Sequence, residues 1–166
     1  MIDRFTIRTA TGYDHTPLSN FWMSDIHLPP WRWCENVGGR ARAVRWASVE
    51  HFYQAAKCMY VEDEDAIYRA ETPGKAKKLG RRATLSVDFE QNKLLIMRMG
   101  LFHKFQPDTH EGEFLLATGD EELVEGNQWG DRFWGVDGIG QNWLGHLLMA
   151  CRAELRAEVL GQQALL

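Results

Sequence analysis

One stretch of the chain places apolar and polar residues at the period of a helix. Residues 46–58 include Ser48, whose hydroxyl is suited to cap the first turn of a helix. The polar positions Glu50, Gln54 and Lys57 stand at i, i+4 and i+7 and therefore share one face. The apolar positions form a separate stripe: Val49, Phe52, Tyr53 and Ala56. The pattern predicts a short helix whose polar row is either a solvated surface or one wall of a pocket.

The remaining pattern predicts several more helices and a few short strands. Asp88 is suited to cap a long helix over 89–105, whose apolar residues, Leu95 and Phe102 among them, predict a central place in the core. Asn142 is suited to cap the last helix, with a frayed tail from about residue 161. Other helices are expected at 62–65 and onward, over 73–82 and over 110–118. Strands are expected over 2–9, 40–46 and 122–125, with irregular or edge structure at 26–33.

The predicted helix over 73–82 is unusually basic. Thr72 and Pro73 are a typical helix start. Ala76, Leu79, Gly80 and Ala83 are expected to face inward. Five cations cover the rest of the helix: Lys75, Lys77, Lys78, Arg81 and Arg82. They form either a solvated face or, for one or two of them, a contact with a phosphate group.

Composition narrows the class of protein. The chain has 166 residues, 45% of them hydrophobic and 25% charged, which suits one soluble domain with a real core. The net charge of −4 argues against a general nucleic-acid coat or a membrane-surface protein. Cys34, Cys58 and Cys151 form no C-x-x-C pair, so neither a disulfide framework nor a zinc site is expected. Without a long apolar segment, a cytoplasmic protein is expected.

Two further stretches carry polar groups between apolar or glycine residues. Ser19 and Asn20 lie between apolar neighbours, a pattern that fits a structural turn or polar groups aimed into a pocket. Residues 127–141 are rich in glycine and hold Trp129, Asp131 and Trp134. This loop before a helix is either a connector or an anion-binding loop.

Several standard catalytic motifs are absent from the sequence. It has no G-x-x-x-x-G-K-[ST], H-E-x-x-H or G-x-S-x-G motif, and His51 is expected to be a structural group. What remains is a carboxylate–lysine–carboxylate set with aromatic neighbours. Cleavage of an N-glycosidic bond needs such parts, because C1′ becomes positively charged, the leaving nitrogen needs a proton and water needs a base. A lysine can hold a phosphate or form a Schiff base with a ring-opened ribose.

Seven segments resemble motifs of the NADAR (YbiA-like) family, in the same order along the chain, over about residues 18–156. Glu50–Lys57 resembles E-H-Y-F-Q-A-x-K, Leu18–Phe21 resembles F-S-N-F, and Thr72–Arg81 resembles S-P-x-x-A-K-x-L-G-R. The C-terminal matches are Leu115–Gly119 with Leu123–Glu125, Asp131 with Trp134-Gly135, and Asn142–Met149. Two departures concern the substrate pocket: Leu18 replaces the usual Phe, and residues 31–45 form a longer, more basic connection.

The resemblance implies a compact, mostly helical α+β fold in a single domain over 1–166, with a few short strands. It also implies an N-glycosidase that needs no metal or cofactor. Members act on ribosylamine phosphates of riboflavin synthesis or remove ADP-ribose from guanine in nucleic acid. By motif match the catalytic residues are Glu50, Lys57 and Asp131. The substrate-binding residues are Ser19, Asn20, Phe21, Gln54, Trp129, Trp134, Gly135 and Asn142.

The expected function is hydrolysis of the N–C1′ bond of a ribosylamine-type small molecule. The alternatives are an ADP-ribosyl hydrolase acting on modified nucleic acid and a non-catalytic reader of ADP-ribose or nucleotides. A nucleic-acid or pyrophosphate ligand is slightly favoured by three arginines, Arg40, Arg42 and Arg45, whereas the net charge of the chain does not favour it. The sharpest expectation is geometric: the polar face of the helix at 46–58 should not face bulk solvent, and Glu50 and Lys57 should share a cleft with Asp131 and Trp134.

Overall fold

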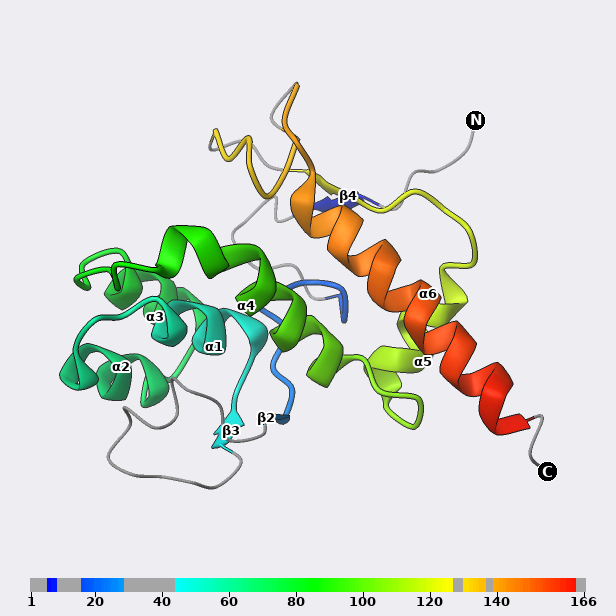
Figure 1. Ribbon diagram of the computed structural model, residues 1–166, viewed down its shortest axis with the longest axis horizontal. Helices are drawn as coiled ribbons and strands as arrows, with labels where there is room; N and C mark the ends of the chain where they lie inside the picture. Colours follow the sequence, from blue (N-terminus) through cyan, green and yellow to red (C-terminus); the bar gives the residue numbers. More distant parts are fainter. Residues whose placement is uncertain (1–5, 9–15, 29–43, 127–129, 137–138, 164–166) are drawn as a thin grey trace. The chain divides into compact units, whose positions relative to one another are not determined.

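The computed structural model describes residues 6–8, 16–28, 44–126, 130–136 and 139–163, and it is mostly helical with short strands (Figure 1). The α+β fold class, mostly helical, is therefore confirmed. The contacts divide the chain into two compact units, Asn20–Lys104 and Met1–Ser19 with Phe105–Leu166. A single domain over the whole chain stays a prediction.

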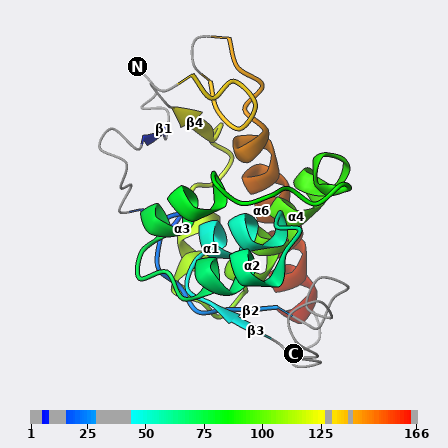
Figure 2. The same ribbon diagram turned by 90° about the vertical axis from the view of Figure 1, so that its left-hand side faces the viewer.

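The unit Asn20–Lys104 begins with a β-hairpin-like pair of strands. β2 (Ile26–Leu28) runs antiparallel to β3 (Val44–Trp46), with Ile26 opposite Trp46 and Leu28 opposite Val44 (Figure 2). These four side chains are buried, whereas the central pair of the two strands is exposed. The alternation is that of strands with one face against a core. The region predicted as irregular or edge structure thus contains a three-residue strand.

Four helices follow, and α1 is the one that contacts all the others: α1 (Val49–Ala56), α2 (Val61–Tyr68), α3 (Pro73–Gly80) and α4 (Phe89–Lys104). Ser48 caps α1, as predicted, because its hydroxyl accepts a hydrogen bond from the backbone N–H of His51. Thr72 caps α3 in the same way. Gly100 lets α4 approach α1, since a Cβ there would lie 3.0 Å from a ring carbon of Phe52.

One expectation for α4 is wrong. Its predicted broad apolar surface includes Leu95 and Phe102, and both are exposed, each to 40%. Met97 and Leu101 of the predicted surface are buried, together with Ile96 and Gly100, so the buried stripe is narrower than predicted. The sequence is apolar over more of the helix than its neighbours in this unit cover.

The second unit pairs its two strands in parallel. β1 (Thr6–Arg8) lies beside β4 (Val124–Gly126), with Thr6 opposite Val124. α5 (His110–Ala117) contacts α6 (Trp143–Gln163), which extends two residues beyond Gly161. Among the described residues, no helix is long and apolar enough to cross a membrane.

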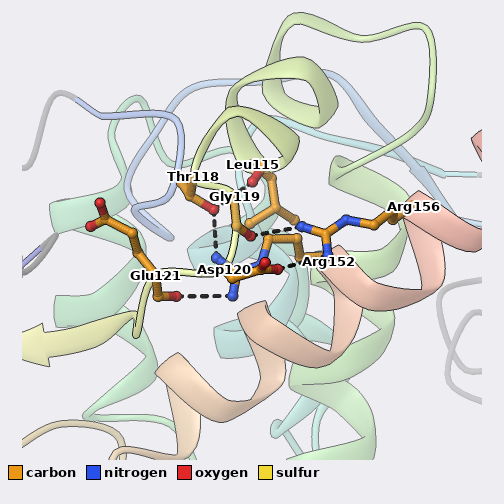
Figure 3. Close-up of polar contacts among 7 residues, drawn as sticks. All are labelled: Leu115, Thr118, Gly119, Asp120, Glu121, Arg152 and Arg156. Atoms are coloured by element: carbon orange, nitrogen blue, oxygen red, sulfur yellow. Dashed lines mark hydrogen bonds and ion pairs between the residues drawn. The ribbon is translucent and has the colours of Figure 1, made fainter.

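Two arginines of α6 hold the turn that ends α5 (Figure 3). Arg152 donates to the Thr118 hydroxyl at 2.7 Å and to the Glu121 carbonyl at 2.9 Å. Arg156 donates to the Asp120 carboxylate at 2.8 Å and to the Gly119 carbonyl at 2.7 Å. The two guanidinium groups thus satisfy carbonyls of the turn that follows α5 and join this turn to α6.

Candidate active site

The polar row of α1 is not a solvated surface. Glu50 and Gln54 are each only 5% exposed, and the Gln54 amide donates to the Glu50 carboxylate at 2.8 Å. A buried carboxylate is costly unless it is paired or protonated, so this pair needs a structural or chemical reason. The expectation that this face does not look out to bulk solvent is confirmed.

The neighbour that covers this row is α3. Gly80 of α3 lies directly against Gln54: a Cβ at position 80 would stand 2.0 Å from Gln54 Oε1. Ala76 and Gly80 are buried, as predicted, whereas Leu79 and Ala83, which were also predicted to face inward, are only half-buried. Pro73 is buried as well. Small residues let the two backbones approach closely, and the missing side chain of Gly80 is the space that the Gln54 amide fills.

Burial and charge act in opposite directions on Glu50. Burial raises the pKa of its carboxyl group, and the positive charge of Lys77, the hydrogen bond from Gln54 and the charges of Lys57 and Arg81 lower it, with burial dominant. The net direction is upward. A carboxyl group with a raised pKa keeps a proton to a higher pH, which is what a general acid requires.

Lys57 follows the last turn of α1 and is half-buried. Burial lowers the pKa of its amine, although the Glu50 charge partly opposes this. Its backbone is held by the chain after α3, because the N–H of Ser86 donates to the Lys57 carbonyl at 2.8 Å. An amine with a lowered pKa is more often neutral, so it is better suited to act as a nucleophile.

Asn20 and Phe21 join the same group of residues. The Asn20 carbonyl accepts the backbone N–H of Glu50 at 3.0 Å, and its side-chain amide donates to Met97 Sδ at 3.4 Å. Asn20 Oδ1 is buried and has no hydrogen-bond partner among the described residues; the same holds for Gln54 Oε1. Unpaired buried acceptors are unusual, and because Gln54 Oε1 packs against Gly80, Asn20 Oδ1 is the better candidate to accept a hydrogen bond from a ligand. The Phe21 ring lies under Lys77, whose Nζ is 5.2 Å from the ring centroid.

Asp131 organises the glycine-rich loop of the other unit. Its Oδ1 accepts the backbone N–H groups of Phe133 at 3.1 Å and Trp134 at 2.9 Å. The Trp134 carbonyl accepts the N–H of Leu144, and its ring meets the Phe133 ring edge-on at 4.9 Å. Gly135 is buried in the same loop. These contacts fix the Asp131 carboxylate relative to the half-buried Trp134 ring.

Asn142 plays a different local part from the predicted helix cap. Its φ is 53°, in the left-handed region, and its side chain bonds two backbone atoms of the β4 segment. Oδ1 accepts the N–H of Glu125 and Nδ2 donates to the Leu123 carbonyl, both at 2.9 Å. Gly145 permits this, because a Cβ there would lie 2.1 Å from the Leu123 carbonyl oxygen. The amide therefore ties the loop and α6 to β4.

Other reactive side chains are structural. His51 is fully buried, with Nδ1 2.7 Å from the Ser48 hydroxyl and Nε2 3.1 Å from the Ala70 carbonyl. Burial lowers the pKa of His51, which favours a neutral ring with these partners. Burial also raises the pKa of the Cys58 thiol to about 12, so this thiol is a poor nucleophile. Among the described residues, no three His, Cys, Asp or Glu side chains are grouped so as to hold a metal ion.

The structure brings together part of the predicted site within each unit. One unit holds five of the predicted site residues: Asn20, Phe21, Glu50, Gln54 and Lys57. A single loop of the other unit holds Asp131, Trp134, Gly135 and Asn142, and the buried Ser19 belongs to that unit as well. Their shared cleft stays a prediction, and Trp129 lies outside the described residues. So do Arg40 and Arg42, whereas Arg45 forms an exposed two-point ion pair with Asp25 at 2.8 and 2.6 Å.

Three residues at this site were predicted only in part: Gly80 was expected to face inward, and Lys77 and Arg81 were among five cations of which one or two could contact a phosphate. Gly80 packs on Gln54, and the charges of Lys77 and Arg81 act on Glu50. The signal that could have found them is their spacing: Lys77, Gly80 and Arg81 stand at i, i+3 and i+4 and share one face of the helix.

Comparison with known proteins supplies a family and several relatives. The model of the NADAR domain family matches residues 7–156. N-glycosidase Npun_R5314 from Nostoc punctiforme is 44% identical over 120 residues, which are 67% of this chain and 75% of that protein. N-glycosidase YbiA from Escherichia coli K12 is 34% identical over 153 residues, covering 90% and 87% of the two chains. The predicted family is therefore confirmed.

Two further relatives bear on the fold and on the metabolic context. The NMR structure of the Escherichia coli protein YbiA superposes with a TM-score of 0.72 at 32% identity and covers 96% of this chain and 89% of that one. The riboflavin biosynthesis protein VVA0006 from Vibrio vulnificus is 39% identical over 115 residues. These are 67% of this chain but only 31% of that longer protein.

Proposed function

The chain belongs to the NADAR family, and on this premise we propose that it hydrolyses the N–C1′ bond of ribosylamine 5′-phosphates, such as the ribosylaminopyrimidine intermediates of riboflavin synthesis. Relatives named as N-glycosidases support the bond that is cleaved. A relative named as a riboflavin biosynthesis protein supports the class of substrate.

The observation that carries the proposal is the buried pair of Glu50 and Gln54 on a helix that ends at Lys57. Burial raises the pKa of the carboxyl group and lowers that of the amine. An acid that keeps its proton and an amine that can lose its proton are the two groups needed to release an amine from an aldehyde carbon. Neither property would arise on a solvated polar row.

The reaction proceeds through C1′ of the ring-opened sugar. The neutral Lys57 amine adds to C1′ of the imine form of the substrate, and one of its N–H protons passes to the base nitrogen. The C1′ bond to the base nitrogen then breaks, and the departing nitrogen takes the proton of Glu50, leaving a protonated imine between Lys57 and the sugar. Water adds to C1′ and releases Lys57 and the aldehyde of the sugar phosphate, while Glu50 recovers its proton. The sum is substrate plus water to free base and ribose 5-phosphate.

Residues of the other unit complete the set. We assign to Asp131 the stabilisation of positive charge at C1′, since two backbone N–H groups hold its carboxylate in a fixed orientation. Trp134 stacks on the base or the sugar. Ser19, Trp129 and Gly135 of this unit are assigned to substrate contact, as are Asn20, Phe21 and Gln54 of the unit Asn20–Lys104. Asn142 acts through the loop, because both ends of its amide bond backbone atoms.

The experiment compares two substrates with the wild-type protein and Lys57→Ala. A ribosylaminopyrimidine 5′-phosphate should yield free base and ribose 5-phosphate in equal amounts, and the variant should lose at least about 100-fold in turnover. An ADP-ribosylated oligonucleotide is the second arm. Release of ADP-ribose from it, with no turnover of the first substrate, would replace the proposal by the alternative substrate. Binding of ADP-ribose with turnover of neither would identify a non-catalytic reader.

A further inference from the structure

α3 presents two differently placed pairs of cations. Lys77 and Arg81 flank Gly80, the residue packed against Gln54, and stand one turn apart. Lys78 and Arg82 also stand one turn apart, but they line an open hollow on another side of the helix, together with Arg69 and Lys75. The same short helix thus carries one pair beside the Glu50–Gln54 pair and a matched pair away from it.

A ring contact places Lys77 at the candidate active site, and the exposed Arg81 directly follows Gly80, which packs on Gln54. Lys77 is half-buried and is held over the Phe21 ring at 5.2 Å. Lys77, Arg81 and Lys57 all act electrostatically on Glu50, with Lys77 the strongest. With Lys57 neutral, as the proposed reaction requires, Lys77, Arg81 and Glu50 together have a formal charge of +1 when Glu50 is ionised and +2 when it is protonated. Like charges gathered around a buried site are costly unless an anion joins them.

We propose that Lys77 and Arg81 form the subsite that binds the 5′-phosphate of the sugar and makes the enzyme select phosphorylated ribosyl substrates. An arginine supplies two parallel N–H donors that match two phosphate oxygens, and a lysine adds a compact point charge. This inference rests on the proposed function, which identifies the sugar as a ribose. Lys57 and Glu50 then act at C1′, and α3 binds the phosphate.

The packing of α3 on α1 suits one substrate that contacts both helices. The small residues Ala76 and Gly80 bring α3 against the polar face of α1. Residues of α1 can therefore contact C1′ of the ribose while residues of α3 contact its phosphate, and no residue needs to contact both.

A kinetic comparison tests the subsite. The quantity measured is the ratio of kcat/KM for a ribosylamine 5′-phosphate to kcat/KM for the same compound without phosphate. Lys77→Gln and Arg81→Gln should each lower this ratio about 10- to 100-fold, the effect expected from losing a charge-assisted hydrogen bond. The matched controls Lys78→Gln and Arg82→Gln should keep the wild-type ratio. Equal losses on both substrates, or equal effects of the controls, would overturn the subsite.

A binding experiment separates this inference from the proposed function. Titration of the wild-type protein and the four variants with D-ribose 5-phosphate, ADP-ribose and D-ribose needs no turnover. Lys77→Gln and Arg81→Gln should weaken binding of both phosphate-bearing ligands about 10-fold or more and leave Lys78→Gln and Arg82→Gln like wild type. This result without catalysis would uphold the subsite and remove the N-glycosidase proposal. If Lys77→Gln and Arg81→Gln bind both phosphate-bearing ligands as tightly as wild type, the subsite is overturned, even if the protein is an active enzyme.

Discussion

Glu50 is the residue whose surroundings depart furthest from what its place on a helix suggests. Its carboxyl group accepts the Gln54 amide at 2.8 Å, and burial raises its pKa. If it donates a proton to the leaving nitrogen, the protonated form is the active one. We expect kcat/KM to fall as pH rises through this raised pKa, with Glu50→Gln lowering kcat by about 10²- to 10⁴-fold and removing that limb of the profile.

The pH profile has a clear control. Glu62→Gln changes an exposed carboxylate on the neighbouring helix and should leave the profile as in wild type. A Glu50→Gln protein that keeps the wild-type pH dependence would show that another group supplies the proton, and the role of Glu50 would then be structural.

At this scale the sequence predicted which side chains share a face, but not their burial. Glu50, Gln54 and Lys57 follow from helical spacing and from motif resemblance. Whether the row is buried or exposed depends on Gly80, which lies 26 positions after Gln54 in the chain. Because Gly80 lacks a side chain, the Gln54 amide fits against α3. No local pattern around α1 contains that information, which is why a solvated row was an open alternative.

The contact between α1 and α3 can be tested through Gly80. Within a helix, replacing Gly by Ala normally adds up to about 1 kcal/mol of stability. At position 80 the new methyl group would stand 2.0 Å from Gln54 Oε1 and must push the amide away from Glu50. We expect Gly80→Ala to lower the free energy of unfolding by about 1–3 kcal/mol and to reduce turnover by 10-fold or more, on the order of the cost of small displacements in active sites.

Gly161 in α6 is the matched control for this substitution. A Cβ there would meet nothing within 4 Å, so Gly161→Ala should be neutral or stabilising by up to about 1 kcal/mol, with full activity. Urea unfolding and turnover of both variants check the pair. A Gly80→Ala protein as stable and active as wild type would show that the close packing of α3 on Gln54 does not position the site.

Among the elements, helices could be predicted from the sequence better than strands. The helix starts at Ser48 and Thr72 follow from capping chemistry, and both caps are present. The partner of β1 could not be predicted, because β1 pairs in parallel with β4 across more than a hundred residues. The exposure of Leu95 and Phe102 was missed for a related reason: periodicity marks apolar positions but does not say which of them a neighbouring element covers.

The stability of the whole molecule should depend on pH through Glu64 of α2. Burial, with a smaller contribution from the Asp65 charge, raises its pKa from 4.5 to about 7. Below the unfolded value the carboxyl group is protonated in both states, and as pH rises towards the folded value the unfolded state gains by ionising first. As pH rises from about 4.5 to 7, the ionisation of Glu64 therefore lowers the free energy of unfolding by about 1–3 kcal/mol.

Glu64→Gln removes this ionisation. We expect the variant to be more stable than wild type above pH 7, and the difference in unfolding free energy to shrink as pH falls towards 4.5. The measurement is urea unfolding of both proteins across this range, with Glu62→Gln as the exposed control on the same helix. A difference that does not change with pH would mean that Glu64 titrates normally in the folded protein.

At the scale of the whole molecule, ordered motifs predicted the family and the fold class from sequence. The family model matches residues 7–156, and the resemblance was read over about 18–156. Composition and spacing did not indicate the division into two units, because no linker-like segment marks the boundary between residues 104 and 105. The proposed catalytic residues come from both units, so the assignment of Asp131 depends on kinetics and not on local contacts alone.

The central claim is that Lys57 reacts with C1′ of the sugar, and trapping with borohydride tests it most directly. Reduction during turnover of a ribosylamine 5′-phosphate should convert the imine into a stable adduct, seen by mass spectrometry as one reduced pentose phosphate on the peptide that contains Lys57. Lys57→Ala should form no adduct under the same conditions. Continued turnover in borohydride with Lys57 unmodified, or an adduct on a different lysine, would contradict the account.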